Sequence, residues 1–237
     1  MRLSAGLLSL GETRADLRTQ RAGIARITLS DGDIFLGLKA SAPAEKTDST
    51  APPAWSLDIR KISVLNTSFG MRTAPAVTEL AVRLADGTVE ECRVRLDSQQ
   101  VSVGSVLLDR GVCSYLTASS GPGAETPPEP ADTTPSLPWT VRVGSVALTD
   151  NRVEYGTLSH RPAAGFDPAF IALSALDLTI DSVYNRGSDI ALQLRRMRFT
   201  ERSGLSVRNA SGRFEMGPAG VSLSGFELGT ARSRLRA

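Results

Sequence analysis

Residues 139 to 148 read Trp139-Thr140-Val141-Arg142-Val143-Gly144-Ser145-Val146-Ala147-Leu148. Apolar side chains alternate with polar or small ones, and a period of two is typical of a β-strand with one apolar face. The alternation breaks once, because Val143 and Val146 are three residues apart. A β-bulge supplies one extra residue in a strand, so we expect both halves of this stretch to keep the same face apolar.

The same spacing, with apolar residues at i, i+2, i+5 and i+7, recurs along the chain. Chance would produce on the order of one or two such runs in a chain of this composition. Bulges bend strands, so repeated bulges predict a sheet that curls into a trough. The six runs are Leu57/Ile59/Ile62/Val64, Val101/Val103/Val106/Leu108, Val141/Val143/Val146/Leu148, Ile171/Leu173/Leu176/Leu178, Leu192/Leu194/Met197/Phe199 and Val221/Leu223/Phe226/Leu228.

Two repeat lengths are visible. The stretch that begins at Trp55 returns 84 positions later at Trp139. A shorter unit of about 40 residues contains an apolar pair, a small polar pair and a further apolar or cysteine residue, and such a period indicates stacked supersecondary units. Its four copies begin at Ile27, Ile62, Val106 and Val146 and return to Ile34, Phe69, Cys113 and Val153.

Turn signals complete the prediction of the fold. Asp86-Gly87 lies between two strand-like runs and predicts a hairpin, as does the stretch from Asn185 to Ser188. No stretch has a convincing helical period. The sequence therefore predicts an all-β fold, an antiparallel meander of repeated units that forms an elongated, curved β-sheet groove.

Two segments rich in Pro, Ser and Thr interrupt the strand pattern. They contain too few apolar residues to offset the entropy of ordering, so we expect mobile linkers. The predicted organisation is the end of a preceding repeat unit, a linker, a β-groove repeat, a second linker and a β-groove repeat cut off at the C-terminus. These parts cover residues 1–40, 41–54, 55–116, 117–138 and 139–237.

The sequence offers no recognisable catalytic or metal-binding constellation. A net charge of +2 is too small to indicate nucleic-acid binding. Cys92 and Cys113 lack CxxC spacing and are predicted to be small buried hydrophobes, although a disulfide remains open in an oxidising compartment. The single His160 lies in a predicted exposed loop, and Glu90 and Glu91 are predicted to point to opposite faces of a strand. We expect no enzymatic activity, no metal and no cofactor.

Several motifs occur in a recognisable order. They are the apolar run from Val141 to Leu148 with Asp150-Asn151 and Tyr155, then Gly165-Phe166-Asp167-Pro168-Ala169-Phe170-Ile171, then Glu201-Arg202-Ser203-Gly204-Leu205, and finally Phe226 to Leu235. In order and spacing they resemble the AsmA-like/TamB (translocation and assembly module) family, particularly its Bacteroidetes type.

The resemblance implies a function and a location. Proteins of that family are anchored in the inner membrane and extend through the periplasm as a β-sheet trough with an apolar concave face. This implies transport of phospholipids toward the outer membrane, together with a role in outer-membrane protein assembly. The implied partners are phospholipids and, in the full-length protein, an outer-membrane assembly protein of the TamA/BamA type. The implied location is the periplasm, with the inner-membrane anchor outside this chain.

Under this hypothesis the inward-facing members of the runs line a lipid groove, while plain core packing is the alternative role of each. Trp55 and Trp139 are predicted to cap the trough edge. The competing function is a secreted β-solenoid adhesin or carbohydrate-binding module with a closed core, which an aromatic content of 5% disfavours. The predicted lining residues are Leu57, Ile59, Ile62, Val64, Val141, Val143, Val146, Leu148, Leu173, Leu176 and Leu178.

Overall fold

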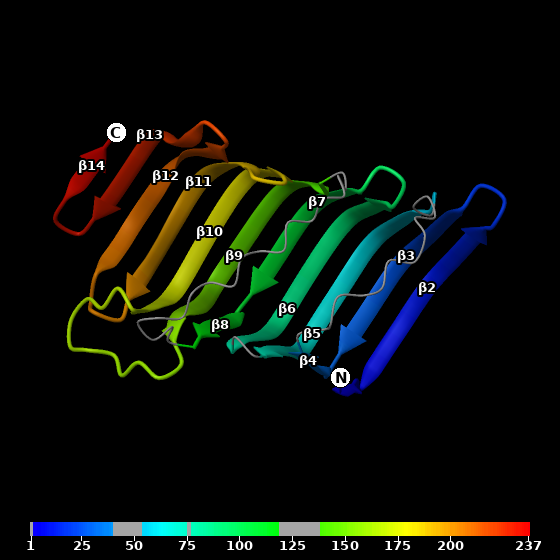
Figure 1. Cartoon of the computed structure of the whole chain (residues 1–237), viewed down its shortest axis with the longest axis horizontal. Helices are drawn as coiled ribbons and strands as arrows, with labels where there is room; N and C mark the ends of the chain where they lie inside the picture. The colour runs from blue at the N-terminus through cyan, green and yellow to red at the C-terminus, as the bar shows by residue number, and fades with distance from the viewer. Residues whose placement is uncertain (1, 40–53, 75–76, 119–137) are drawn as a thin grey trace.

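The computed structural model describes residues 2–39, 54–74, 77–118 and 138–237 (Figure 1). They form one large mixed β-sheet of 14 strands, in which most neighbouring strands are antiparallel. No helix occurs among these residues, so the predicted all-β class is confirmed. The two predicted linkers lie outside the described residues, except for their outermost positions.

The sheet has a nearly linear order, β1-β4-β5-β6-β7-β9-β10-β11-β12-β13-β14, with β2 beside β3, β3 beside β5, and β8 between β6 and β9. β1 with β2, β3 with β4, and β7 with β8 each act as two halves of one long strand. The strands are β1 (Arg2–Ser4), β2 (Leu7–Asp16), β3 (Arg21–Ser30), β4 (Asp33–Lys39), β5 (Ser56–Ala74), β6 (Thr78–Arg95), β7 (Gln100–Asp109), β8 (Val112–Thr117), β9 (Thr140–Thr157), β10 (Phe170–Arg186), β11 (Asp189–Glu201), β12 (Ser206–Gly217), β13 (Gly220–Thr230) and β14 (Arg234–Arg236).

The prediction of a purely antiparallel meander is wrong at two places. β3 and β4 run parallel to β5, and β7 and β8 run parallel to β9. Ile27 pairs with Ile62, and Val106 pairs with Val146. The repeat of about 40 residues is therefore the register of the two parallel pairs. A parallel pair requires the chain to return to its starting end, and a Pro-rich segment separates the two strands in both cases.

The longer repeat is also a structural repeat. The amide of Ser56 donates to the carbonyl of Gln20 over 3.0 Å, and the amide of Thr140, 84 positions after Ser56, donates to the carbonyl of Gln99 over 2.8 Å. Gln20 and Gln99 share a left-handed conformation, with φ of 52° and 50°. The two parallel pairs thus start with the same hydrogen bond to the same kind of strained residue.

The two predicted hairpins have different outcomes. The stretch from Asn185 to Ser188 is a hairpin turn, since β10 ends at Arg186 and β11 begins at Asp189, with Gly187 at a φ of 58°. The Asp86-Gly87 prediction is wrong, because β6 continues straight through both residues. Gly87 pairs with Val64 on one side and Leu108 on the other, and an added Cβ would lie 3.3 Å from Leu108 Cδ2. This glycine makes room for its neighbours and does not reverse the chain.

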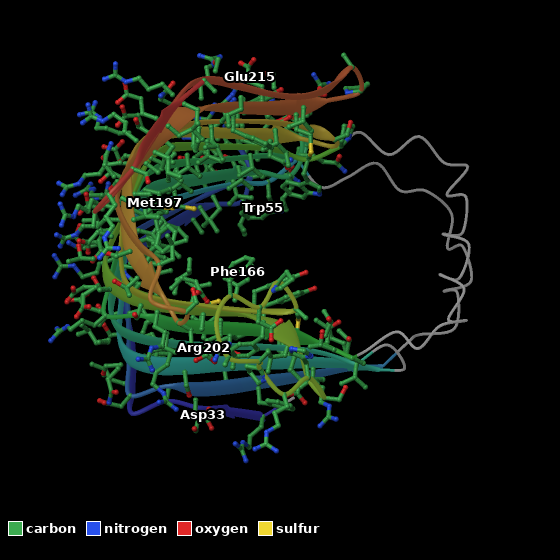
Figure 2. The ribbon with its side chains drawn as sticks, turned by 90° about the vertical axis from the view of Figure 1, so that its left-hand side faces the viewer. Asp33, Trp55, Phe166, Met197, Arg202 and Glu215 are labelled. Carbon is green, nitrogen blue, oxygen red and sulfur yellow. The ribbon has the colours of Figure 1, made fainter. Side chains whose placement is uncertain are left out.

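The small polar pairs of the short repeat form bends in strands that continue in the same direction. Asp31, Asn66, Arg110 and Asp150 all have a φ between 43° and 52°. Asp and Asn adopt this region more readily than other non-glycine residues. Because neighbouring strands bend at the same level, the whole sheet folds over, and Figure 2 shows the resulting C-shaped cross-section.

The predicted bulges are present in only some of the six runs. Register shifts occur at the three-residue step in β10, β11 and β13. In β5, β7 and β9 the three-residue step contains one residue that has no partner, and the neighbouring strand also has one such residue at the same level. Examples are Arg60 beside Glu91 and Gly104 beside Gly144. Paired strands there bend together and keep their register.

Asn151 and Gly111 form the tightest packing at one of these bends. The Asn151 side chain is 5% exposed. Its Oδ1 accepts from the Gly111 amide at 2.8 Å, and its Nδ2 donates to the carbonyls of Leu108 and Thr149 at 3.1 and 2.9 Å. A Cβ on Gly111 would lie 2.5 Å from Asn151 Oδ1. Glycine is therefore required at position 111 by its neighbour on the next strand.

We expect Asn151→Ala to lower the free energy of unfolding by about 1–3 kcal/mol, because it leaves the buried Gly111 amide without a partner. Urea denaturation followed by circular dichroism measures this. Asn185→Ala is the matched control, since Asn185 hydrogen-bonds only exposed turn carbonyls, and a change within about 0.5 kcal/mol is expected. Equal effects of the two substitutions would show that the Asn151 contact does not hold the bend.

Candidate apolar trough

The concave face of the sheet is lined by apolar side chains. Figure 2 shows Met197 and Trp55 projecting into the space that the C-shaped sheet partly encloses, whereas Glu215 and Asp33 project outward. Residues directly paired across strands share a face. The pairings of Met197 and of the residues that alternate with Trp55 therefore identify the concave face, which we call the trough.

One line of paired residues runs across the entire sheet along the trough floor. Every member is apolar or glycine, and every successive pair is a direct strand partner. Eleven strands at about 4.8 Å spacing make this line roughly 48 Å long. We call it the central row: Leu8, Leu29, Val64, Gly87, Leu108, Leu148, Leu178, Met197, Ala210, Leu228 and Leu235.

A second line lies two residues away along each strand, except in β11, where a register shift makes the step from Leu194 to Met197 three residues, and it has the same character. It begins at the β2 edge and ends in β12. Together the two lines make a continuous apolar floor. The members of this second row are Leu10, Ile27, Ile62, Val89, Val106, Val146, Ile180, Leu194 and Gly212.

The floor is only partly shielded from solvent. Among the described residues the buried apolar side chains are Ile59, Leu176, Val207 and Ala210, and no large side chain is fully buried. Most residues of the two rows are half-buried, and Leu8, at the β2 edge, is 62% exposed. A continuous half-exposed apolar surface of this kind is typical of an interaction site or a ligand-binding groove.

The predicted lining residues lie on this face, and the structure divides them into three groups. Val64, Leu148 and Leu178 belong to the central row, and Ile62 and Val146 belong to the second row. Leu57, Val141 and Val143 line the wall that carries Trp55, linked through the pairs Leu57–Val94, Val94–Val101 and Val101–Val141. Ile59, Leu176 and Leu173 lie next to the bends, and Ile59 and Leu176 are buried at 8% and 5% exposure. Burial makes core packing the better description of Ile59 and Leu176.

Sequence reasoning missed several members of the floor. Val89 and Gly87 were hidden by the incorrect hairpin, because a turn there would break the alternation of β6. Met197 and Leu228 belong to apolar runs that the sequence shows, but the sequence does not show which residues of other strands pair with them. Strand pairing, which the alternation does not encode, is what places these residues in the same rows as Leu148.

The convex face carries the charges. Cross-strand ion pairs include Lys61 with Glu90 at 3.3 Å, Arg93 with Asp58 at 2.6 Å and Arg195 with Asp181 at 2.9 Å. All six side chains are between 38% and 69% exposed, and exposed pairs of this kind contribute little to stability. Their main effect is to keep the outer face solvated, so the two faces differ sharply in polarity.

Glu90 and Glu91 do not follow the regular alternation on which their prediction rested. Both line one hollow of about 500 Å³ beside Arg60 and Lys61. Glu91 has a φ of 55°, and a left-handed residue interrupts the alternation that the prediction assumed. No sequence signal marks a glutamate for this conformation.

The two cysteines are free and half-buried. Cys113 pairs with Val82 of β6, and Cys92 lies ten positions further along that strand. At about 3.3 Å per residue this separation is far beyond the reach of a disulfide. Burial raises the pKa of both thiols. The open possibility of a disulfide within the chain is therefore excluded in this structure.

Asp167 organises the loop between β9 and β10, at residues 158–169. Its carboxylate, 6% exposed, contacts His160 Nε2 at 2.7 Å and accepts from the amides of Ala163 and Ala169 at 2.9 and 3.0 Å. His160 was predicted to be exposed, but its side chain is 32% exposed and tied to Asp167. The hydrogen bond from His160, followed by that from the Ala163 amide, lowers the Asp167 pKa from 3.8 to about 2.

A carboxyl with a lowered pKa stabilises the folded loop above its unfolded pKa, and this contribution is lost as the pH falls from about 4 toward 2. We expect the amide NMR signals of Ala163 and Ala169 to titrate with a midpoint near pH 2. In Asp167→Asn the titration should be absent, and both amides should already exchange faster at pH 7. A wild-type midpoint at the ordinary aspartate value near 3.9 would show that the loop bonds do not form in solution.

No group of three or more His, Cys, Asp or Glu residues that could hold a metal ion occurs in the described part of the chain. Within the same residues, no helix is long and apolar enough to cross a membrane. Comparisons of the chain with protein-family models, with curated proteins and with solved structures found no match.

Proposed function

We propose that this chain is a segment of a periplasm-spanning, bridge-like lipid-transport protein of the TamB/AsmA-like kind, acting in outer-membrane biogenesis. In this proposal the trough shields phospholipid acyl chains from water while they move along it. The single observation that carries the proposal is the central row, an unbroken apolar line across eleven strands on an open concave face.

The energetics favour an acyl chain as the occupant. Transfer of a methylene group from water to an apolar surface is favourable by about 0.8 kcal/mol. A chain lying along the floor would contact several strands at once, and the polar headgroup could remain in solvent at the open side. Neither row of the floor contains a polar or charged side chain that would fix the acyl chain at one position. Such a surface suits movement along the trough better than storage at one site.

A closed core, as in the competing solenoid adhesin, would require large apolar side chains that are fully buried. The described residues contain none. The edge strands β2 and β14 lie at opposite ends of the sheet and do not pair with each other (Figure 1), so the sheet does not close on itself. Both observations support a surface groove over a sealed core.

The proposal extends to location and partners. We place the segment in the periplasm, as part of a protein held in the inner membrane by a region outside this chain. The full-length protein would then deliver phospholipid to the outer membrane. There it would meet an outer-membrane assembly protein of the TamA/BamA type and aid outer-membrane protein assembly.

The test is native mass spectrometry of the purified chain after incubation with vesicles of phosphatidylethanolamine and phosphatidylglycerol. We expect bound phospholipid on the wild type, loss of most of it in Leu148→Asp, and wild-type binding in Thr149→Asp. Thr149 is the matched control because it is the next residue along β9 and is exposed.

Met197→Gln provides a second test that alters shape little, since the two side chains are similar in length. It should weaken lipid binding while the circular dichroism spectrum stays unchanged. A folded wild type without lipid, or equal binding in all four proteins, would contradict the proposed function.

A further inference from the structure

The loop at residues 158–169 is held by its own Asp167 and also by a residue of a neighbouring turn, Arg202. Arg202, in the turn between β11 and β12, donates from Nη2 to the carbonyl of Ala163 at 2.6 Å and to that of Gly165 at 3.4 Å. The Arg202 amide also donates to the carbonyl of Ala172 at 2.9 Å. The loop is therefore fixed by its own buried carboxylate and by a neighbouring turn, so its tip has a defined position.

Phe166 occupies the tip of this fixed loop. It follows Gly165, whose φ of 82° turns the chain, and its side chain is 62% exposed. Figure 2 shows Phe166 in the space between the two walls of the C-shaped sheet. An aromatic ring that is held in place yet left in water is a feature of ligand-binding surfaces, because the fixed backbone reduces the entropy lost on binding.

The chemistry around Phe166 favours an apolar occupant. Asp167 is buried with its oxygens occupied, and Arg202 donates to loop carbonyls. The ring itself offers an apolar surface opposite the floor. An acyl chain in the trough beside this loop would meet side chains of the sheet on one side and this ring on the other.

We propose that Phe166 is a ligand-contacting residue of the trough, which packs on an acyl chain from the side opposite the floor. This inference rests on the proposed function and deepens it, because it names a position where the open trough is narrowed. There the chain is sheltered on two sides, by the sheet and by the Phe166 ring.

The test places a single tryptophan at three positions in turn, in a Trp55→Phe, Trp139→Phe background. The variants are Phe166→Trp at the loop tip, Leu148→Trp on the floor and Thr149→Trp on the outer face. Fluorescence is measured with phospholipid whose acyl chains carry bromine, a contact quencher, and with the same lipid without bromine. We expect bromine-dependent loss of fluorescence in F166W and L148W, of similar size, and none in T149W.

The outcomes separate this inference from the proposed function. Quenching of L148W without quenching of F166W would overturn the role of Phe166 and leave the trough proposal standing. Quenching of neither would contradict the proposed function itself. Equal quenching in T149W would show non-specific adsorption of lipid and would overturn both.

Arg202→Gln tests whether the fixed loop presents the ring. Added to F166W, it should reduce the quenching of the loop tryptophan, because the loop loses its anchor to the turn between β11 and β12. Added to L148W, it should leave the quenching unchanged. If the substitution leaves the F166W signal intact, the anchored loop is not what positions this residue.

Discussion

Neighbouring strands of this sheet must bend at the same level, because a strand that bent alone would lose its hydrogen bonds to both neighbours. The structure meets this constraint with left-handed residues such as Asp31, Asn66 and Asp150 at one level and with glycines at another. At Gly144 even a Cβ would lie 2.6 Å from the carbonyl oxygen of Gly104. The small residues allow the backbones to approach each other where the sheet folds over.

The aligned bends determine where the apolar side chains lie. In β5, β7 and β9 the paired strands bend at the same level and keep their register, whereas register shifts accompany the bend in β10, β11 and β13. In both cases an apolar residue in one strand stays opposite an apolar residue or a glycine in the next. The central row is the result. The same alignment places the ion pairs on the convex face, so that one face is suited to water and the other to an apolar ligand.

The open trough also explains why this chain has so small a core. In a sandwich the apolar face would pack on a second sheet, and the buried area would stabilise the fold. Here much of that area remains half-exposed among the described residues, and stability depends more on the backbone ladder and on local contacts such as Asn151 with Gly111. A protein that leaves apolar surface uncovered in this way gives up stability for binding, which fits the proposed role in shielding acyl chains.

The sequence by itself determined the all-β class, the repeat spacings, the hairpin at Asn185–Ser188 and the alternation that gives each strand one apolar face, because these depend on residues near each other in the chain. Only the tertiary structure decided that β3 and β4 lie parallel to β5, that Asp86-Gly87 continues a strand, and that Glu90 and Glu91 line one hollow. It also decided that Leu8, Met197 and Leu235 lie in one row, and that Phe166 faces the trough. The physical reason is that alternation is identical in parallel and antiparallel strands, and pairing arises from contacts between residues far apart in the chain.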